Sequence, residues 1–342
     1  MQEKEVCICK KCILPTTFRD IEFNAEGICN YCTSSKTVAK ERNVAPEYKA
    51  QCVKEIDDII ESVRGKGQYD CAVGFSGGKD SSYLLWILKE KYKLSVLAVT
   101  LDHGFFPKVT TENINEVPRK LGIDVVSYKI NAGFMERFFK YKFENYKTKA
   151  VFDSMCGDCS DILEGSVMKV AALFRIPLVF IGLSPEQVNR YFYELPYEHI
   201  NANWEKEYFS EGYFDKNDSQ YMWNATTENE KNLKVILPFH VWDYSESEVV
   251  KKLEDLELLS SQNSSPLKTR CKILDAMCYI DKQRLGYDGF IAPFSDLIRF
   301  GKAPREKYYD LFFGKDFELN MEHVNEVFKR LDIDVEKILK KP

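Results

Sequence analysis

Hydrophobic and polar positions in the middle of the chain follow two alternating periods. Five short apolar runs have the length of buried strands, at 69–75, 94–101, 124–130, 177–183 and 234–239. Apolar residues recur every three to four positions at 80–92, 112–121, 134–146 and 160–174, which predicts helices. Strands that alternate with helices of this length predict a doubly wound α/β fold with a buried parallel sheet.

The pattern changes on both sides of this region, and the changes divide the chain into four parts. We expect a cysteine-rich head resembling a zinc ribbon at 1–40, a helical linker at 41–67, the α/β domain at 68–240 and a mainly helical region at 241–342. Helical stripes in the last part lie at 245–259, 271–284, 303–313 and 321–339. Residues 189–232 interrupt the α/β pattern with many aromatic side chains, which fits a small packed subdomain or a lid over the sheet.

Composition and charge narrow the class of protein. A hydrophobic content of 44% is enough for a sizeable core, and no apolar run reaches the roughly 18–20 residues of a membrane span. We also expect no secretory signal, because the opening MQEKEVCICKKC lacks an apolar segment. A net charge of −5 favours a small-molecule substrate over nucleic acid. Eleven cysteines then favour thiolate metal sites in a reducing cytoplasm over disulfides.

A glycine-rich loop follows the first predicted strand directly and opens the first predicted helix. It has the sequence SGGKDS at 76–81. Gly77 and Gly78 allow a tight turn whose backbone N–H groups converge on an anion, and Lys79 adds a full positive charge. Asp80 and Ser81 are placed to cap the helix or to contact a metal ion on bound phosphates. The loop departs from the GxxxxGK[ST] pattern, which disfavours an ordinary kinase or GTPase.

Two CxxC pairs in the head, sixteen residues apart, predict a metal site. They are Cys9-x2-Cys12 and Cys29-x2-Cys32, and this spacing lets two tight turns present four thiolates tetrahedrally to Zn²⁺. An iron–sulfur site or reduced thiols are the alternatives, and Cys7 is a substitute for Cys9. A closed site of four sulfurs is usually structural.

A second cysteine group is more ambiguous. Cys156-x2-Cys159 is expected in the loop before the fourth helix of the α/β pattern, and by spacing alone it is a redox pair or half a metal site. Cys52, Cys71 and Cys278 lie on apolar stripes and are most simply core residues.

The loop resembles the PP-loop, SGGxDS, of the ATP pyrophosphatase (adenine nucleotide alpha hydrolase) superfamily. The resemblance implies an enzyme that binds Mg²⁺ and ATP, adenylates a carbonyl oxygen and lets a nucleophile displace AMP, with Lys79 and Asp80 as catalytic residues. It also implies that the end of the second strand, near His103, borders the adenine or the reacting centre, although His103 alone is more simply a structural loop residue. The implied ATP contacts are Phe75, Ser76, Gly77, Gly78, Lys79, Asp80, Ser81, Ser82, Leu101, Asp102 and Gly182.

The second cysteine group resembles that of the tRNA 2-thiouridine and 2-thiocytidine synthetases. CGDCSDILEGSVMKVA at 156–171 stands in the place of their CxxC pair, and the segments 237–256 and 264–271 resemble the approach to their third cysteine. The resemblance implies that Cys156, Cys159 and Cys271 are catalytic and hold a [4Fe–4S] cluster whose fourth iron carries sulfur. The alternative is a CxxC with an unrelated Cys271, and Cys278 is the reserve third ligand.

Most of the chain also resembles the N-acetyl sugar amidotransferases, through 9–32, 76–85 and LGYDGFIAPFSDLIRFGKAPREKYYDLFFG at 285–314. That family implies an acetamidino product made with ammonia from a separate glutaminase subunit. The triad of Cys156, Cys159 and Cys271 is absent from the pattern of that family, and it favours sulfur over ammonia as the nucleophile.

The leading hypothesis is therefore an ATP-dependent, AMP-forming sulfurtransferase acting on a small molecule, with a nucleotide sugar as one class and with a separate sulfur donor. Sugar amidotransferase and tRNA thiolase are the enzyme alternatives, and an ATP sensor or a zinc-ribbon nucleic-acid binder are the non-enzymatic ones. A homodimer is compatible with each hypothesis.

Overall fold

The structure is a computed structural model that describes residues 6–34, 46–146, 150–184, 214, 217–223, 225–264, 266–299, 301, 303–314 and 319–340. The strands in these residues are β1 (Cys71–Gly74), β2 (Val96–Asp102), β3 (Asp124–Lys129), β4 (Leu178–Ile181) and β5 (Lys234–Ile236). The helices are α1 (Asn30–Thr33), α3 (Pro46–Val63), α4 (Lys79–Trp86), α5 (Lys108–Leu121), α6 (Ala132–Glu144), α7 (Val151–Leu173), α10 (Glu228–Lys231), α11 (Glu246–Asp255), α12 (Ser261–Ser264), α13 (Pro266–Thr269), α14 (Lys272–Leu285), α15 (Ile291–Arg299), α16 (Arg305–Phe313), α17 (Met321–Leu331) and α18 (Val335–Leu339). A π-helical turn, η1 (Ile87–Lys91), and two 3₁₀ turns, η2 (Asp218–Tyr221) and η3 (Pro238–His240), complete the elements.

The five strands form one parallel sheet in the order β3-β2-β1-β4-β5. Each strand falls within or beside a predicted apolar run, so the predicted α/β class with a doubly wound parallel sheet is confirmed. β1 is central, with β2 on one side and β4 on the other, so the strand order reverses there. The carboxyl end of β1 is thus the position at which folds of this kind bind ligands.

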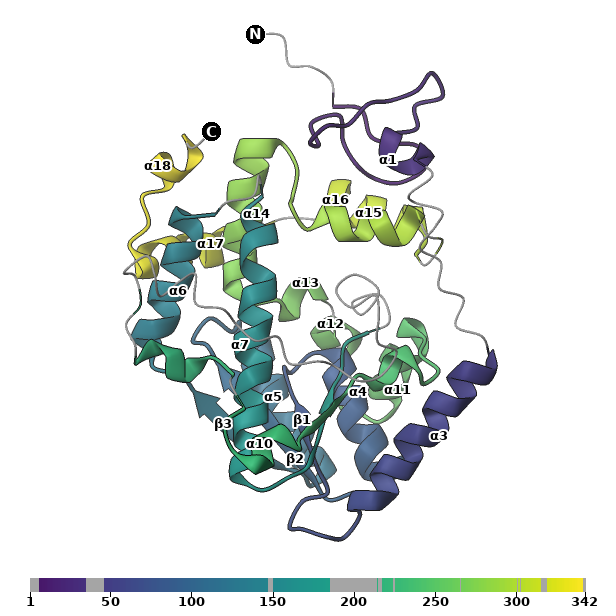
Figure 1. The fold of residues 1–342 in the computed structure, drawn as a ribbon. Helices are drawn as coiled ribbons and strands as arrows, with labels where there is room; N and C mark the ends of the chain where they lie inside the picture. Colours follow the sequence, from purple (N-terminus) through teal and green to yellow (C-terminus); the bar gives the residue numbers. More distant parts are fainter. Residues whose placement is uncertain are drawn as a thin grey trace. The chain divides into compact units, whose positions relative to one another are not determined.

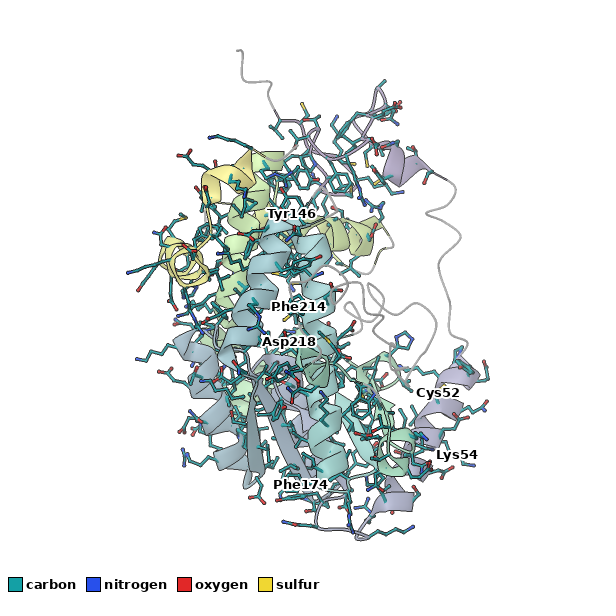
Figure 2. All side chains as sticks on the ribbon, turned by 60° about the vertical axis from the view of Figure 1, so that its left-hand side comes forward. Cys52, Lys54, Tyr146, Phe174, Phe214 and Asp218 are labelled. Carbon is teal, nitrogen blue, oxygen red and sulfur yellow. The ribbon has the colours of Figure 1, made fainter. Side chains whose placement is uncertain are left out.

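Helices cover both faces of the sheet (Figure 1). On one face, alternate residues of the strands pack against α3, α4, α5 and α11. On the other face, the remaining alternate residues pack against α7. The amphipathic α3 shows the pattern clearly, because Cys52 is buried against the sheet while Lys54 is exposed (Figure 2). Burial also confirms the core placement expected for Cys71 and Cys278.

The chain forms two compact units. Unit 1 comprises residues 1–43, 138–156 and 272–342, and unit 2 comprises 44–137 and 157–271. Unit 2 contains the sheet and the helices that cover it. Unit 1 contains the head and the helices from α14 to α18, which confirms the predicted helical character of the C-terminal region.

Two helix boundaries differ from the predicted ones. α7 begins at Val151, so the expected loop around Cys156 and Cys159 is helical, because buried Val151 and Met155 extend the apolar face past the polar residues between them. The predicted helix 321–339 is divided into α17 and α18, because Asp332 adopts a left-handed conformation with φ 50°.

Of the aromatic-rich segment 189–232, residues 214, 217–223 and 225–232 are described, and the remainder of that predicted insertion lies outside the described residues. The described part packs on α6. Phe134 contacts Phe214, with ring centroids 5.7 Å apart, and Arg137 donates two hydrogen bonds, of 2.7 and 2.8 Å, to the Asp218 carboxylate. Phe214 and Asp218 are labelled in Figure 2.

Candidate functional site

The SGGKDS loop connects the carboxyl end of β1 to the start of α4, as the sequence predicts. Gly77 has φ +74°, and a Cβ atom there would lie 2.9 Å from the carbonyl oxygen of Thr110 on α5. Both facts require glycine at this position. Asn113 of α5 donates a 2.9 Å hydrogen bond to the Gly77 carbonyl oxygen, so α5 holds the loop in place.

The first turn of α4 leaves its backbone N–H groups without a side-chain cap. Gly78 is the N-cap residue and makes no side-chain hydrogen bond to the helix. The expectation that Asp80 or Ser81 caps the helix is wrong, because the tight glycine turn places both of them inside the helix. Ser81 Oγ instead accepts a 3.3 Å hydrogen bond from the Ser76 N–H and so closes the loop. Uncapped N–H groups and the helix dipole together favour an anion at this end.

Lys79 and Asp80 meet two residues that the sequence did not single out. Lys79 Nζ lies 2.8 Å from Asp80 Oδ2, 3.2 Å from the Tyr244 hydroxyl and 3.7 Å from Glu246 Oε1. The Tyr244 hydroxyl also donates a hydrogen bond to Asp80 Oδ1. The side chains of Lys79 and Asp80 are only 12% and 17% exposed, so these charges interact with little screening. The loop therefore holds a cation, a carboxylate and a phenol together at the end of β1.

The end of β2 supplies further predicted contacts. Leu101 is buried, and Asp102 accepts a hydrogen bond from the Gly104 N–H and pairs with Lys129. His103 is buried, and its Nδ1 accepts a hydrogen bond from the Phe105 N–H at 3.1 Å, which fits a structural role for this side chain.

The end of β4 approaches the loop closely. A Cβ atom at Gly182 would lie 3.2 Å from the Ser81 Cα, so glycine lets β4 pass directly beside the start of α4. Phe75 and Ser82 are buried under the loop, and Ser82 Oγ donates to the Gly78 carbonyl oxygen. The predicted ATP-binding residues of β1, α4 and β4 thus gather at one edge of the sheet.

The four head cysteines form one group. Their sulfur atoms all lie within 4.8 Å of one another and are buried, with 3.9 Å between Cys9 and Cys32 and 3.8 Å between Cys12 and Cys29. A tetrahedral ion with bonds of about 2.3 Å to sulfur requires sulfur separations of about 3.8 Å. A four-iron cluster binds each cysteine to a different iron and needs wider spacing. The donor set therefore fits one tetrahedral metal ion, and Cys7, which is exposed, lies outside the group.

The four thiols also perturb one another's protonation. Hydrogen bonds with Cys12 lower the pKa of Cys9 and lower the pKa of Cys29 to about 7, whereas the pKa values of Cys12 and Cys32 are raised by the neighbouring thiols. Four adjacent thiols cannot all ionise against one another's charge. A bound metal ion removes that opposition, because it pairs with all four thiolates.

The second cysteine group is distributed over two elements. Cys156 and Cys159 lie three residues apart on α7, and Cys271 directly precedes α14. Among the described residues, the head cysteines are the one group of three or more candidate ligands that the structure brings together. A cluster held by Cys156, Cys159 and Cys271 therefore stays a prediction. The reserve ligand Cys278 is buried and donates to Asp288 Oδ1 at 3.1 Å.

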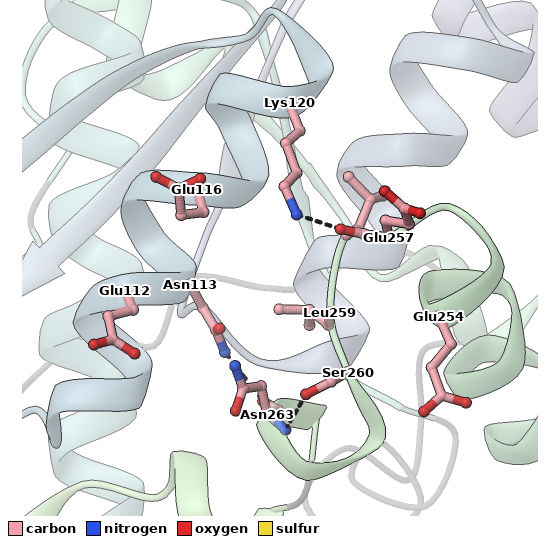
Figure 3. Close-up of a pocket in the computed structure, with 10 residues that line it drawn as sticks. Glu112, Asn113, Glu116, Lys120, Glu254, Glu257, Leu259, Ser260 and Asn263 are labelled. Carbon is pink, nitrogen blue, oxygen red and sulfur yellow. Dashed lines mark hydrogen bonds between the residues drawn. The ribbon is translucent and has the colours of Figure 1, made fainter.

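A cavity of about 600 Å³ lies between α5 and the segment that follows α11 (Figure 3). Four carboxylates line it, from Glu112, Glu116, Glu254 and Glu257, together with the single cation of Lys120. This charge is unfavourable for phosphate groups. Asn113 lies on its wall and also donates to the Asn263 carbonyl oxygen at 3.1 Å. The cavity is therefore less suited to an anion than the glycine loop, which has Lys79 and the uncapped start of α4.

The sheet order and the SGGKDS loop together define a doubly wound parallel α/β fold with a glycine loop at the carboxyl end of its central strand, preceded by a four-cysteine head. No protein-family model matches the chain. The uncharacterized protein MJ1599 of Methanocaldococcus jannaschii is 25% identical over 301 residues, which are 87% of this chain and 90% of that protein.

Other similarities are partial or distant. Cytoplasmic tRNA 2-thiolation protein 1 of Meyerozyma guilliermondii is 24% identical over 170 residues, so the chain spans 44% of its length, and the match covers 45% of this chain. The solved U34-tRNA thiolase NcsA of Methanococcus maripaludis is 15% identical with a TM-score of 0.38, over 96% of this chain and 88% of that one. None of the described helices has the length and apolar character that a membrane crossing requires.

Proposed function

We propose that the protein is an ATP-dependent, AMP-forming transferase that replaces a carbonyl oxygen of a small-molecule substrate with sulfur. The observation that carries this proposal is the arrangement of Lys79 and Asp80 at the uncapped start of α4, on the carboxyl edge of the parallel sheet. A cation and convergent N–H groups at that edge suit a bound triphosphate.

The proposed reaction has two displacements. The substrate oxygen attacks the α-phosphorus of ATP, and pyrophosphate leaves with the electron pair of the broken P–O bond. A sulfur nucleophile at the oxidation level of sulfide then adds to the carbon, and AMP leaves with the former carbonyl oxygen. A cluster on Cys156, Cys159 and Cys271 would supply the sulfur when bound.

The loop residues have distinct roles in this proposal. The N–H groups of 77–81 and the Lys79 ammonium hold the pyrophosphate and stabilise its charge as it leaves. Asp80 would help to hold the Mg²⁺ that accompanies ATP. Lys79 pairs with Asp80 and Glu246, and a phosphate group bound at Lys79 would compete with these carboxylates.

Sulfur is favoured over ammonia as the nucleophile. A partial relative is named for tRNA 2-thiolation, and its match covers 45% of this chain, which supports thiolation chemistry. The same similarity keeps tRNA as an alternative substrate. The net charge of −5 argues against it, because the negative charge of the protein opposes binding to the phosphate backbone. The resemblance of 285–314 to sugar amidotransferases keeps ammonia, from a glutaminase partner, as the other alternative.

We propose Zn²⁺ for the four-cysteine head. The support is the 3.8–3.9 Å spacing of its paired sulfurs and their burial. Zinc bound by four thiolates stabilises a segment that is too small to have its own core. A reducing, cytoplasmic setting suits these thiolates and the second cysteine group.

The decisive experiment is anaerobic purification with iron and acid-labile sulfide analysis, together with ATP–pyrophosphate exchange. We expect a brown protein whose iron is lost in Cys156→Ala and Cys271→Ala and kept in the control Cys7→Ser, which changes an exposed cysteine outside both groups. Exchange should disappear in Lys79→Ala with the circular dichroism spectrum unchanged. A colourless anaerobic protein that consumes ammonia would reject sulfur transfer, and thiolation of added tRNA would reject a small-molecule substrate.

A further inference from the structure

The segment 285–314 has no part in the proposed chemistry at the SGGKDS loop. It packs against the four-cysteine head within unit 1. Apolar residues of the head, among them Ile13 and Phe18, share one core with Tyr287 and Ile291. Helices α15 and α16 of this segment lie next to the head (Figure 1). Arg305 of these helices contacts two of the head cysteines, and Arg299 is buried beside the Tyr31 ring of the second CxxC turn.

Arg305, the first residue of α16, holds the backbone of the first CxxC turn. Its Nε donates to the Cys12 carbonyl oxygen at 2.9 Å, and its Nη2 donates to the Cys9 carbonyl oxygen at 3.0 Å. One planar guanidinium therefore bridges the two residues that provide half of the sulfur ligands. The fork geometry of arginine suits this double contact, and a lysine ammonium does not reproduce it.

Arg299, the last residue of α15, adds a buried positive charge. Its side chain is only 6% exposed, and its Nη1 is buried with no hydrogen-bond partner among the described residues. Its Nη2 pairs with Asp296, whose side chain is 44% exposed. The guanidinium lies 5.9 Å from the ring centroid of Tyr31, within the second CxxC turn.

The charge of the metal site explains both arginines. Four thiolates and a divalent ion carry a net charge of −2, and a buried dianion is costly unless cations neutralise it. Arg305 brings a positive charge to the backbone of the first CxxC turn, and the buried Arg299 guanidinium, partly offset by Asp296, lies beside the second turn.

We propose that Arg299 and Arg305 are positioning residues of the four-cysteine site: Arg305 holds the backbone of the first CxxC turn, and Arg299 supports the second turn from its buried position, so that the four thiolates can bind one tetrahedral ion. The proposal rests on metal binding at the head, which is itself part of the proposed function. It gives 285–314 a function in the metal site and makes the head and these helices one structural body.

The test is a Zn²⁺ titration of the full-length protein against a chromophoric chelator, with Co²⁺ absorption as a second readout of tetrahedral thiolate coordination. We expect Arg299→Met and Arg305→Met each to weaken zinc binding by about 10–100-fold, as loss of residues that support metal ligands typically does. Arg305→Lys should fall between wild type and Arg305→Met. The matched control is Arg19→Gln, an exposed arginine of the same head whose side chain lies over the Phe18 ring; its backbone carbonyl oxygen accepts a hydrogen bond from the Tyr31 hydroxyl, which the substitution keeps.

The outcomes separate the two proposals. Wild-type zinc affinity in both methionine variants, or an equal loss in Arg19→Gln, would overturn the roles of Arg299 and Arg305. A wild-type protein that takes up neither Zn²⁺ nor Co²⁺ would instead reject the metal site itself. Circular dichroism of the zinc-saturated variants shows whether they are folded, and a folded variant with weakened affinity supports the proposal.

Discussion

Replacing Tyr244 with phenylalanine removes the hydroxyl group that contacts the SGGKDS loop and keeps the aromatic ring. That oxygen donates to Asp80 and accepts from Lys79 at 3.2 Å. The ring itself packs on Phe239, with centroids 5.1 Å apart, and this contact survives the change. The substitution therefore tests the hydroxyl alone.

The structure gives the size of the effect. A hydrogen bond to a charged partner contributes about 1.5–3 kcal/mol, and the neighbouring Lys79 and Asp80 side chains are only 12% and 17% exposed. The ion pair between Lys79 and Asp80 survives the change, so we use the lower end, about 1.5 kcal/mol. Since about 1.36 kcal/mol is a factor of ten, kcat/KM for ATP should fall about tenfold.

The assay is ATP–pyrophosphate exchange at varied MgATP, with Tyr83→Phe as the control. Tyr83 stacks on the same Phe239 ring, with centroids 6.0 Å apart, and within the described part of the chain its hydroxyl makes no hydrogen bond to Lys79 or Asp80. We expect the control to keep wild-type kcat/KM. Unchanged or improved kcat/KM in Tyr244→Phe would refute the reasoning, because Asp80 would then be oriented without the phenol.

Three further changes test other parts of the structure. Gly77→Ala should abolish nucleotide binding measured by calorimetry, because the left-handed backbone costs an alanine about 1–2 kcal/mol and the new Cβ would lie 2.9 Å from the Thr110 carbonyl oxygen. The control is Gly65→Ala, which should keep binding, because Gly65 also has a left-handed backbone, with φ +67°, but open space around its Cβ position. Chelating the head metal should abolish amide exchange protection at 9–32 and leave pyrophosphate exchange intact; loss of both would contradict this. Burial lowers the pKa of Lys169 to about 8, so between about pH 8 and 10.5 the unfolded state binds the proton that the folded state has released. The free energy of unfolding should therefore rise over this pH range, by about 1–2 kcal/mol after screening. Chemical denaturation of Lys169→Met should show no such rise.

The sequence predicted the sheet and its loop because both are encoded locally. The strand residues around Val73 form a continuous apolar run, and the two glycines that follow mark the turn before α4. The grouping of the four head cysteines could also be predicted from the sequence, because the spacing of the two CxxC pairs identifies the four ligands.

The missed features depend on contacts between distant positions. Tyr244 lies 165 residues from Lys79, and no local pattern connects them. The start of α7 was missed because Gly157 and its polar neighbours resemble a loop, whereas buried Val151 and Met155 make the segment helical. Arg305 has no sequence signal for a metal site, because it contacts the backbone of the ligands and not their sulfurs.

Asn113 uses both hydrogens of one amide nitrogen, donating to the carbonyl oxygens of Gly77 and Asn263. Deamidation of this side chain would replace that nitrogen with a carboxylate oxygen and turn two attractions into two repulsions. The side chain is only 3% exposed, so the chemistry is open to it only when α5 loosens. The fraction of protein deamidated at Asn113 would therefore increase with each separation of α5 from the SGGKDS loop, and it would persist after the two have come together again.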